Sequence, residues 1–140
     1  MWKGGKTDMS QLSLARQVDL AIRELADELR HLNSGIVFLQ IRNNEIGKFG
    51  IRHDPIECKD GVMTELGSGL SDAHIRAFAQ LAVQSLSRKN NWTHGEIAIE
   101  FRLKQNTLMS SVQFESNYNM SNLMIRRTQM QYRNAQFVKE

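Results

Sequence analysis

The densest group of chemically capable side chains in this sequence is residues 53–58, HDPIEC. Imidazole, carboxylate and thiolate groups are the ligand types that zinc and iron take in proteins. A metal site needs three or four of them converging from rigid elements, and six consecutive residues around a proline do not converge unaided. The spacing matches no standard zinc pattern. We therefore expect a polar strand end and turn, and a metal-dependent enzyme is the third hypothesis. Its candidate residues are His53, Asp54, Glu57 and Cys58.

A second suggestive segment is residues 122–137, NLMIRRTQMQYRNAQF, with no acidic residue between Asn117 and Lys139. Arginines and aromatic rings together can follow a nucleic-acid backbone and stack on bases. Three arginines reach only a few phosphates, so this footprint is weak. A helix that packs its methionines on the sheet or on a partner explains the segment better. A nucleic-acid-binding regulator using Arg126, Arg127 and Arg133 is therefore the alternative hypothesis.

Two glycine-containing segments resemble parts of phosphate-binding motifs. Gly5-Lys6-Thr7 looks like the end of a P-loop, but the motif needs an earlier glycine and a preceding buried strand, for which the sequence has no room. Gly67-Ser68-Gly69 precedes a predicted helix, but Asp72 already occupies the positive end of the helix dipole. No G-x-S-x-G elbow is present, and the acidic neighbours of Cys58 favour its protonated form. We expect no catalytic activity and no cofactor.

The first residues are predicted to carry no function. Lys3-Gly4-Gly5 can be encoded by a purine-rich, ribosome-binding type of sequence, followed by a short spacer before Met9. Under this hypothesis, synthesis starts at Met9 in a bacterium. A tail or an expression scar is the other interpretation, and terminal segments of this kind are commonly disordered. We therefore divide the chain into a disordered leader or tail, residues 1–9, and a single α+β domain, residues 10–140.

Three segments have the spacing and end signals of helices. Apolar residues recur with a 3.6-residue period between Ser10 and Leu32, and Ser10 or Ser13 can cap the start. Residues 71–89 form the second predicted helix, with Ser71 as its N-cap. Residues 119–136 are rich in helix formers but have only a thin apolar stripe, dominated by methionine.

Two segments alternate between apolar and polar residues, as strands with one buried face do. Residues 36–53 predict a hairpin with turn chemistry at Asn43-Asn44 and Gly47, and with Ile36 and Phe38 pointing away from its inner face. The predicted inner face consists of Val37, Leu39, Ile41, Phe49 and Ile51. Residues 95–116 predict the second hairpin, and residues 61–66 a short strand. The expected fold is an antiparallel sheet of two hairpins with helices packed on one face, in the order α-β-β-(β)-α-β-β-α.

Composition restricts the class of protein. The chain has 140 residues, of which 41% are hydrophobic and 24% charged, as in a single globular domain. A single cysteine excludes an internal disulfide and suits a reducing cytoplasm. No secretory signal is visible, and no apolar run reaches the roughly 18 residues of a membrane span. The net charge of +3 is modest for a nucleic-acid-binding protein.

Core patterning without a catalytic set favours association as the function. We expect a small cytoplasmic bacterial protein that acts as a homodimer, adaptor or regulator, with itself or another protein as partner and no role at a membrane. The expected contact residues lie on the last helix and on the outward side of the first strand. They are Ile36, Phe38, Met120, Leu123, Met124, Arg126, Arg127 and Met130.

Overall fold

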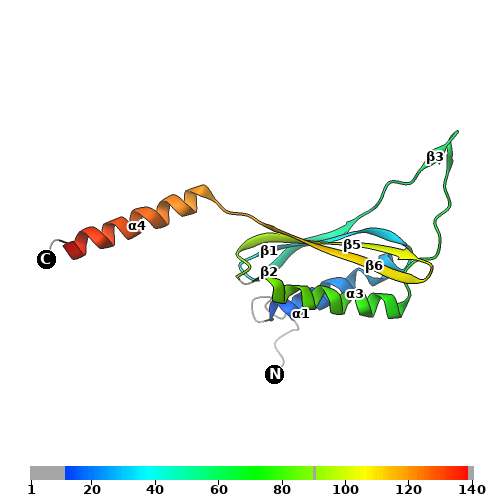
Figure 1. Ribbon diagram of the computed structural model, residues 1–140, viewed down its shortest axis with the longest axis horizontal. Helices are drawn as coiled ribbons and strands as arrows, with labels where there is room; N and C mark the ends of the chain where they lie inside the picture. Colours follow the sequence, from blue (N-terminus) through cyan, green and yellow to red (C-terminus); the bar gives the residue numbers. More distant parts are fainter. Residues whose placement is uncertain (1–11, 90, 139–140) are drawn as a thin grey trace, which may run out of the picture.

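The computed structural model describes residues 12–89 and 91–138, and it has the predicted α+β architecture (Figure 1). A four-stranded antiparallel sheet has the order β2-β1-β5-β6, and a small two-stranded sheet pairs β3 with β4. The elements are α1 (Leu14–Glu24), α2 (Ala26–Leu29), β1 (Ser34–Arg42), β2 (Glu45–Arg52), β3 (Cys58–Lys59), β4 (Val62–Met63), α3 (Asp72–Ser85) with a 3-10 turn (Leu86–Arg88), β5 (His94–Lys104), β6 (Thr107–Ser116) and α4 (Met120–Val138). The predicted leader, residues 1–9, lies outside the described residues.

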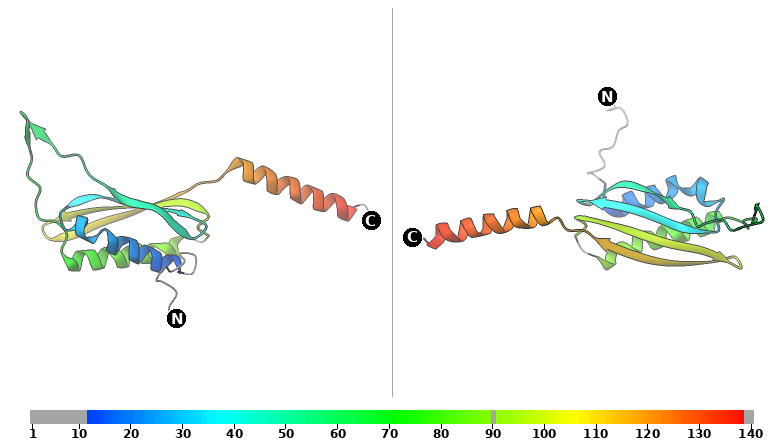
Figure 2. Two further views of the ribbon diagram at one scale, coloured as in Figure 1. Left: turned by 180° about the vertical axis from the view of Figure 1, so that it is seen from behind. Right: turned by 90° about the horizontal axis from the view of Figure 1, so that it is seen from above.

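The main sheet is built from two halves of the same form. Each half is a helix followed by a hairpin, α1-β1-β2 and α3-β5-β6, and the inner strands β1 and β5 pair antiparallel with Val37 opposite Ile99. Helices α1 and α3 lie side by side on one face of the sheet, as predicted (Figure 2). Within the described ranges, no helix is long and apolar enough to span a bilayer.

Both hairpins turn through two residues in the left-handed region. Asn43 and Asn44 have φ of 51° and 61°, and Gln105 and Asn106 have φ of 51° and 63°. Two consecutive positive φ values are the mark of a type I′ turn, whose twist matches that of the flanking strands. Asparagine tolerates this conformation better than most residues. Of the two sites with predicted turn chemistry, Asn43-Asn44 makes the turn, whereas Gly47 lies within β2.

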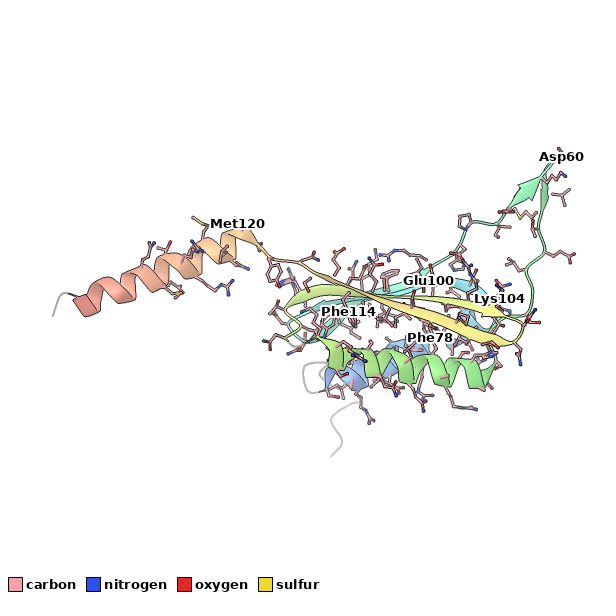
Figure 3. All side chains as sticks on the ribbon, viewed as in Figure 1. Asp60, Phe78, Glu100, Lys104, Phe114 and Met120 are labelled. Atoms are coloured by element: carbon pink, nitrogen blue, oxygen red, sulfur yellow. The ribbon has the colours of Figure 1, made fainter. Side chains whose placement is uncertain are left out.

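The core lies between the sheet and its two covering helices. The predicted inner face of the first hairpin is confirmed, since Val37 and Leu39 have no exposed surface and Ile41 has 3%. In the second hairpin, Phe101 is fully buried and meets Phe78 of α3 edge to face, with 5.6 Å between ring centroids. Figure 3 shows Phe78 at this junction of helix and sheet. The alternation seen in the sequence therefore selects the buried face correctly.

The helix predicted between Ser10 and Leu32 is shorter and interrupted. Ser13 caps α1 by accepting a hydrogen bond from the Arg16 amide, at 3.1 Å. The Leu25 amide donates to both Ala21 and Ile22, so the regular ladder ends there and α2 follows as one short turn. The prediction of a continuous helix was wrong because the apolar spacing persists across this break.

A buried polar side chain, Gln17, joins α1 to the first hairpin. Its exposed fraction is 2%. Its amide donates to the Asn44 carbonyl at 3.1 Å, and its side-chain oxygen accepts from the Ile46 amide at 2.8 Å. The side chain therefore satisfies backbone groups that packing has removed from water.

We expect Gln17→Met, which keeps the length but not the hydrogen bonds, to lower the free energy of unfolding by about 2 kcal/mol, because the Ile46 amide is left buried and unpaired. Urea unfolding followed by circular dichroism measures the change. Gln80→Met, at an exposed site on α3, is the matched control and should be nearly neutral. Equal effects of the two substitutions would show that the buried hydrogen bonds do not contribute.

The segment that re-enters the domain before α3 runs unusually close to α2. The Leu70 amide donates to the Leu29 carbonyl at 3.2 Å. A Cβ added at Gly69 would lie 1.8 Å from the Arg30 carbonyl oxygen. Only a residue without a side chain allows this approach.

Two segments project from the domain. Residues 53–68, which we call the arm, leave the sheet after β2 and carry β3 and β4 near the tip. Helix α4 leaves after β6 in the opposite direction (Figures 1 and 2). Helix α4 has the position in the chain that was predicted, but it extends away from the sheet instead of covering it.

Candidate protein interface

Helix α4 begins with a local cap that needs no help from the domain. The side chain of Asn119 accepts a hydrogen bond from the Ser121 amide at 2.8 Å, and its carbonyl accepts one from the Leu123 amide at 3.1 Å. An asparagine in this position satisfies an amide that has no partner in the first turn. The start of α4 is therefore set by the sequence next to it, in agreement with the predicted helix start.

Large apolar side chains of α4 are exposed to solvent. Met120, Met124 and Met130 have exposed fractions of 68%, 57% and 62%, while Leu123 is half-buried. Met120, Leu123, Met124 and Arg127 have the i, i+3, i+4, i+7 spacing of one helix face. These four residues therefore share one helix face, an apolar stripe with an arginine within it. Arg126 lies outside this spacing, and partner binding by the predicted helix residues stays a prediction.

The charges of α4 have one sign. The helix has arginines at 126, 127 and 133 and no acidic residue, a formal net charge of +3. Arg126 and Arg127 are exposed and form no ion pair among the described residues. Without acidic residues, α4 also lacks the i, i+4 ion pairs that stabilise isolated helices. A partner with carboxylates would supply the missing charge.

Ile36 and Phe38, the two predicted contact residues on the outward side of β1, are less exposed than the methionines of α4. Phe38 is only 9% exposed, because the Arg52 guanidinium lies 4.3 Å from its ring centroid and Gly50 lies beside its ring. Arg52 is held there by a 3.0 Å ion pair with Glu96. Ile36 is half-buried. Partner binding by Ile36 and Phe38 stays a prediction, and for Phe38 it would require Arg52 to move aside.

An open hollow of about 740 Å³ lies where α4 leaves the sheet. Its lining includes Arg42, His94, Glu96, Tyr118 and Met120. The Arg42 Nε donates to the His94 Nε2 at 3.2 Å, so this ring nitrogen is an acceptor. The lining contains residues of both charge signs and one exposed methionine. The hollow is therefore a surface recess suited to a protein side chain, and it lacks the enclosed apolar walls of a small-molecule site.

The candidate metal ligands among residues 53–58 do not converge in the structure. The His53 Nε2 lies 2.6 Å from a carboxylate oxygen of Glu28, on α2, and the Cys58 thiol is exposed with its Sγ 3.6 Å from the Ile56 carbonyl oxygen. Among residues 12–89 and 91–138, no three His, Cys, Asp or Glu side chains come together in a way that could hold a metal ion. The residues of this segment belong to the arm instead.

The arm contains a feature that the sequence reasoning missed. Asp60 and Gly61 have φ of 51° and 78° and connect β3 to β4 in a type I′ turn. The Thr64 amide donates to the Glu57 carbonyl at 2.8 Å and closes this small hairpin. Its tip exposes Val62 and Met63, with exposed fractions of 69% and 67%. The Asp-Gly pair was the signal, but the flanking strands are too short to show an alternation.

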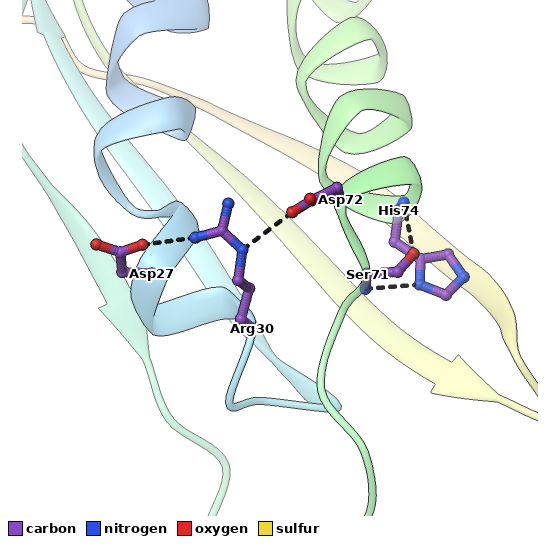
Figure 4. Close-up of polar contacts among 5 residues, drawn as sticks. All are labelled: Asp27, Arg30, Ser71, Asp72 and His74. Carbon is purple, nitrogen blue, oxygen red and sulfur yellow. Dashed lines mark hydrogen bonds and ion pairs between the residues drawn. The ribbon is translucent and has the colours of Figure 1, made fainter.

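The glycine-containing segment before α3 leads into a helix whose first turn is capped. Ser71 and His74 form a reciprocal capping box, in which each side chain accepts from the backbone amide of the other, at 3.2 and 3.1 Å (Figure 4). Asp72 in the first turn binds Arg30 at 3.0 Å, and Arg30 also binds Asp27. The hydrogen bond and charge of Asp72 raise the pKa of Arg30. The helix N-terminus is thus already occupied. Gly5-Lys6-Thr7 lies outside the described residues.

Comparison of the chain with protein-family models, with curated proteins and with solved structures found no match. The functional argument therefore depends on α4 and on the surfaces around it.

Proposed function

We propose that this protein acts by protein–protein association and that α4 is its docking element. One observation carries the proposal: a helix of 19 residues projects from the domain and exposes a row of methionines. A bacterial cytoplasm is the setting that we propose, supported by the single cysteine and its exposed, unbridged thiol.

The energetics of α4 favour a bound state. Most helical stability in proteins comes from the packing of an apolar face, and α4 has no acidic residues to form stabilising ion pairs along its own surface. The domain supplies little packing to the exposed side chains of α4. Methionine side chains are flexible and polarisable, and they adapt well to a partner surface. Binding of a partner would bury the apolar stripe and, by doing so, stabilise the helix.

The alternative, nucleic-acid binding, uses the same helix through Arg126, Arg127 and Arg133. It is supported by the exposure of Arg126 and Arg127 and by the absence of acidic residues in the sequence of α4. So few charges predict weak binding that salt removes readily. Retention on a DNA column that disappears when the three arginines become alanine, with the association state unchanged, would favour this alternative.

The experiment that tests docking replaces both central stripe residues, Leu123→Gln with Met124→Gln. We expect association to weaken about 100-fold, which corresponds to about 2.7 kcal/mol, because two apolar side chains lose a buried contact of about 1–2 kcal/mol each. Sedimentation equilibrium of the purified chain over a range of concentrations measures this. Helix content should also fall, since α4 would lose the packing that a partner supplies.

The matched control replaces one leucine and one methionine that are exposed elsewhere, Leu20→Gln with Met109→Gln, on α1 and β6. These changes should leave the association constant unaltered. The thermal unfolding of both variants should match the parent domain, because neither pair belongs to the core. If the α4 variant associates as tightly as the control, α4 is not the docking element.

A further inference from the structure

The arm and α4 have little packing on the domain, so binding a partner would stabilise both segments. An isolated two-stranded hairpin is marginally stable in water, and β3 and β4 have only two residues each. All residues of the arm, 53–68, are exposed. The arm thus presents the same physical situation as α4, at the other end of the sheet.

The charges of the two segments are opposite. The arm has four carboxylates and one lysine, a formal net charge of −3, whereas α4 has +3. The carboxylates of the arm form no ion pair among the described residues. They belong to Asp54, Glu57, Asp60 and Glu65.

Both segments also expose apolar side chains between their charges. On the arm, Ile56 and Leu66 are 46% and 53% exposed, in addition to Val62 and Met63. The α4 stripe has Arg127 within it, so a purely apolar partner would bury that charge unpaired, at a large cost. A surface with apolar and acidic groups in alternation meets both requirements, and the arm is such a surface.

The two segments cannot meet within one chain. Strand β2 ends at Arg52, level with Ile36 and Glu100, whereas β6 ends at Ser116, opposite Gly95. These two levels are five residues apart along β5, about 17 Å, and the arm and α4 continue outward from there. Figure 3 shows Asp60 at the tip of the arm and Met120 at the start of α4 at opposite extremities.

We propose that α4 of one copy docks on the arm of a second copy of this chain. This inference rests on the proposed docking role of α4 and names its partner. Pairing α4 with α4, or arm with arm, would bring like charges together, which is costly at a desolvated contact. Among the three ways in which the projecting segments of two copies can pair, only arm with helix joins opposite charges.

Charge reversal tests the pairing. One variant carries Glu57→Lys and Glu65→Lys on the arm, and the other carries Arg126→Glu and Arg127→Glu on α4. Each alone should associate about 100-fold more weakly than the parent chain. An equimolar mixture should associate with near-parent affinity, because each reversed segment then meets an opposite charge. Sedimentation equilibrium of the mixture, with one variant labelled by a fluorophore, measures this rescue.

Charge reversal at exposed sites outside both segments, Glu24→Lys with Glu100→Lys, is the control and should leave association unchanged. Failure of the arm variant to weaken association, or of the mixture to restore it, would overturn the arm as partner. A parent chain that stays monomeric at every concentration would do the same. If Leu123→Gln with Met124→Gln weakens association and the arm variant does not, the arm is overturned as the partner while α4 keeps its docking role, so the two failures are distinguishable.

Discussion

Replacing Phe101 by alanine should lower the free energy of unfolding by about 3–5 kcal/mol. The ring is fully buried in the central strand β5, packs edge to face against Phe78, and covers Gly35 of β1, where an added Cβ would lie 3.2 Å from it. Truncation removes contacts to both the helix layer and the neighbouring strand. The cavity that remains is bounded by strands and a helix that cannot close over it fully.

Urea unfolding of Phe101→Ala and of Met109→Ala separates burial from strand propensity. Met109 lies on the adjacent strand, opposite Arg102, and is exposed. Its substitution should change stability by less than about 0.5 kcal/mol. A loss below 1 kcal/mol for Phe101→Ala would contradict the packing between α3 and the sheet.

Gly69→Ala should destabilise the domain by about 3 kcal/mol, at the upper end of what over-packing costs. The added methyl group would overlap the backbone of Arg30, so α2 or the segment before α3 must move. That movement would also disturb the hydrogen bond between the Leu70 amide and the Leu29 carbonyl. The sign of the stability change is informative, because Gly→Ala in an unstrained loop stabilises a protein by lowering the conformational entropy of the unfolded chain.

The nearby Gly67→Ala is the matched control. An added Cβ there would meet only the Asn33 side chain, at 3.4 Å. This change should be neutral or slightly stabilising, by at most about 1 kcal/mol. Thermal unfolding of both variants gives the comparison, and equal stabilities would show that the close approach at Gly69 does not constrain the fold.

The sheet could be predicted because its strands have one buried and one solvated face. Val37, Leu39 and Ile41 alternate with outward residues, and this period of two identifies both the strand and its core face. The N-cap Ser71 could also be predicted, because capping depends on neighbouring residues only, and Ser13 was one of the two candidates for the first helix. These features depend on residues that are neighbours in the chain, so they can be predicted from the sequence.

Other features depend on contacts between residues that are far apart in the sequence. Gln17 is buried because a distant turn needs its hydrogen bonds, and Gly69 is required because α2 passes beside it. The stripe of α4 would look the same in the sequence whether the helix covered its own sheet or projected from it. The residues of α4 could therefore be named in advance, but the acidic, apolar surface of the arm could not.

The strand order has a further consequence for the arm. The arm lies in the connection between β2 and α3, which links the two helix–hairpin halves along the chain. The pairing of β1 with β5 joins these halves in the sheet. The entropy of closing a loop grows only logarithmically with its length, so doubling the connection costs about 0.6 kcal/mol. The arm can thus lengthen, shorten or change sequence almost without loss of domain stability, which leaves its sequence free to suit the proposed docking.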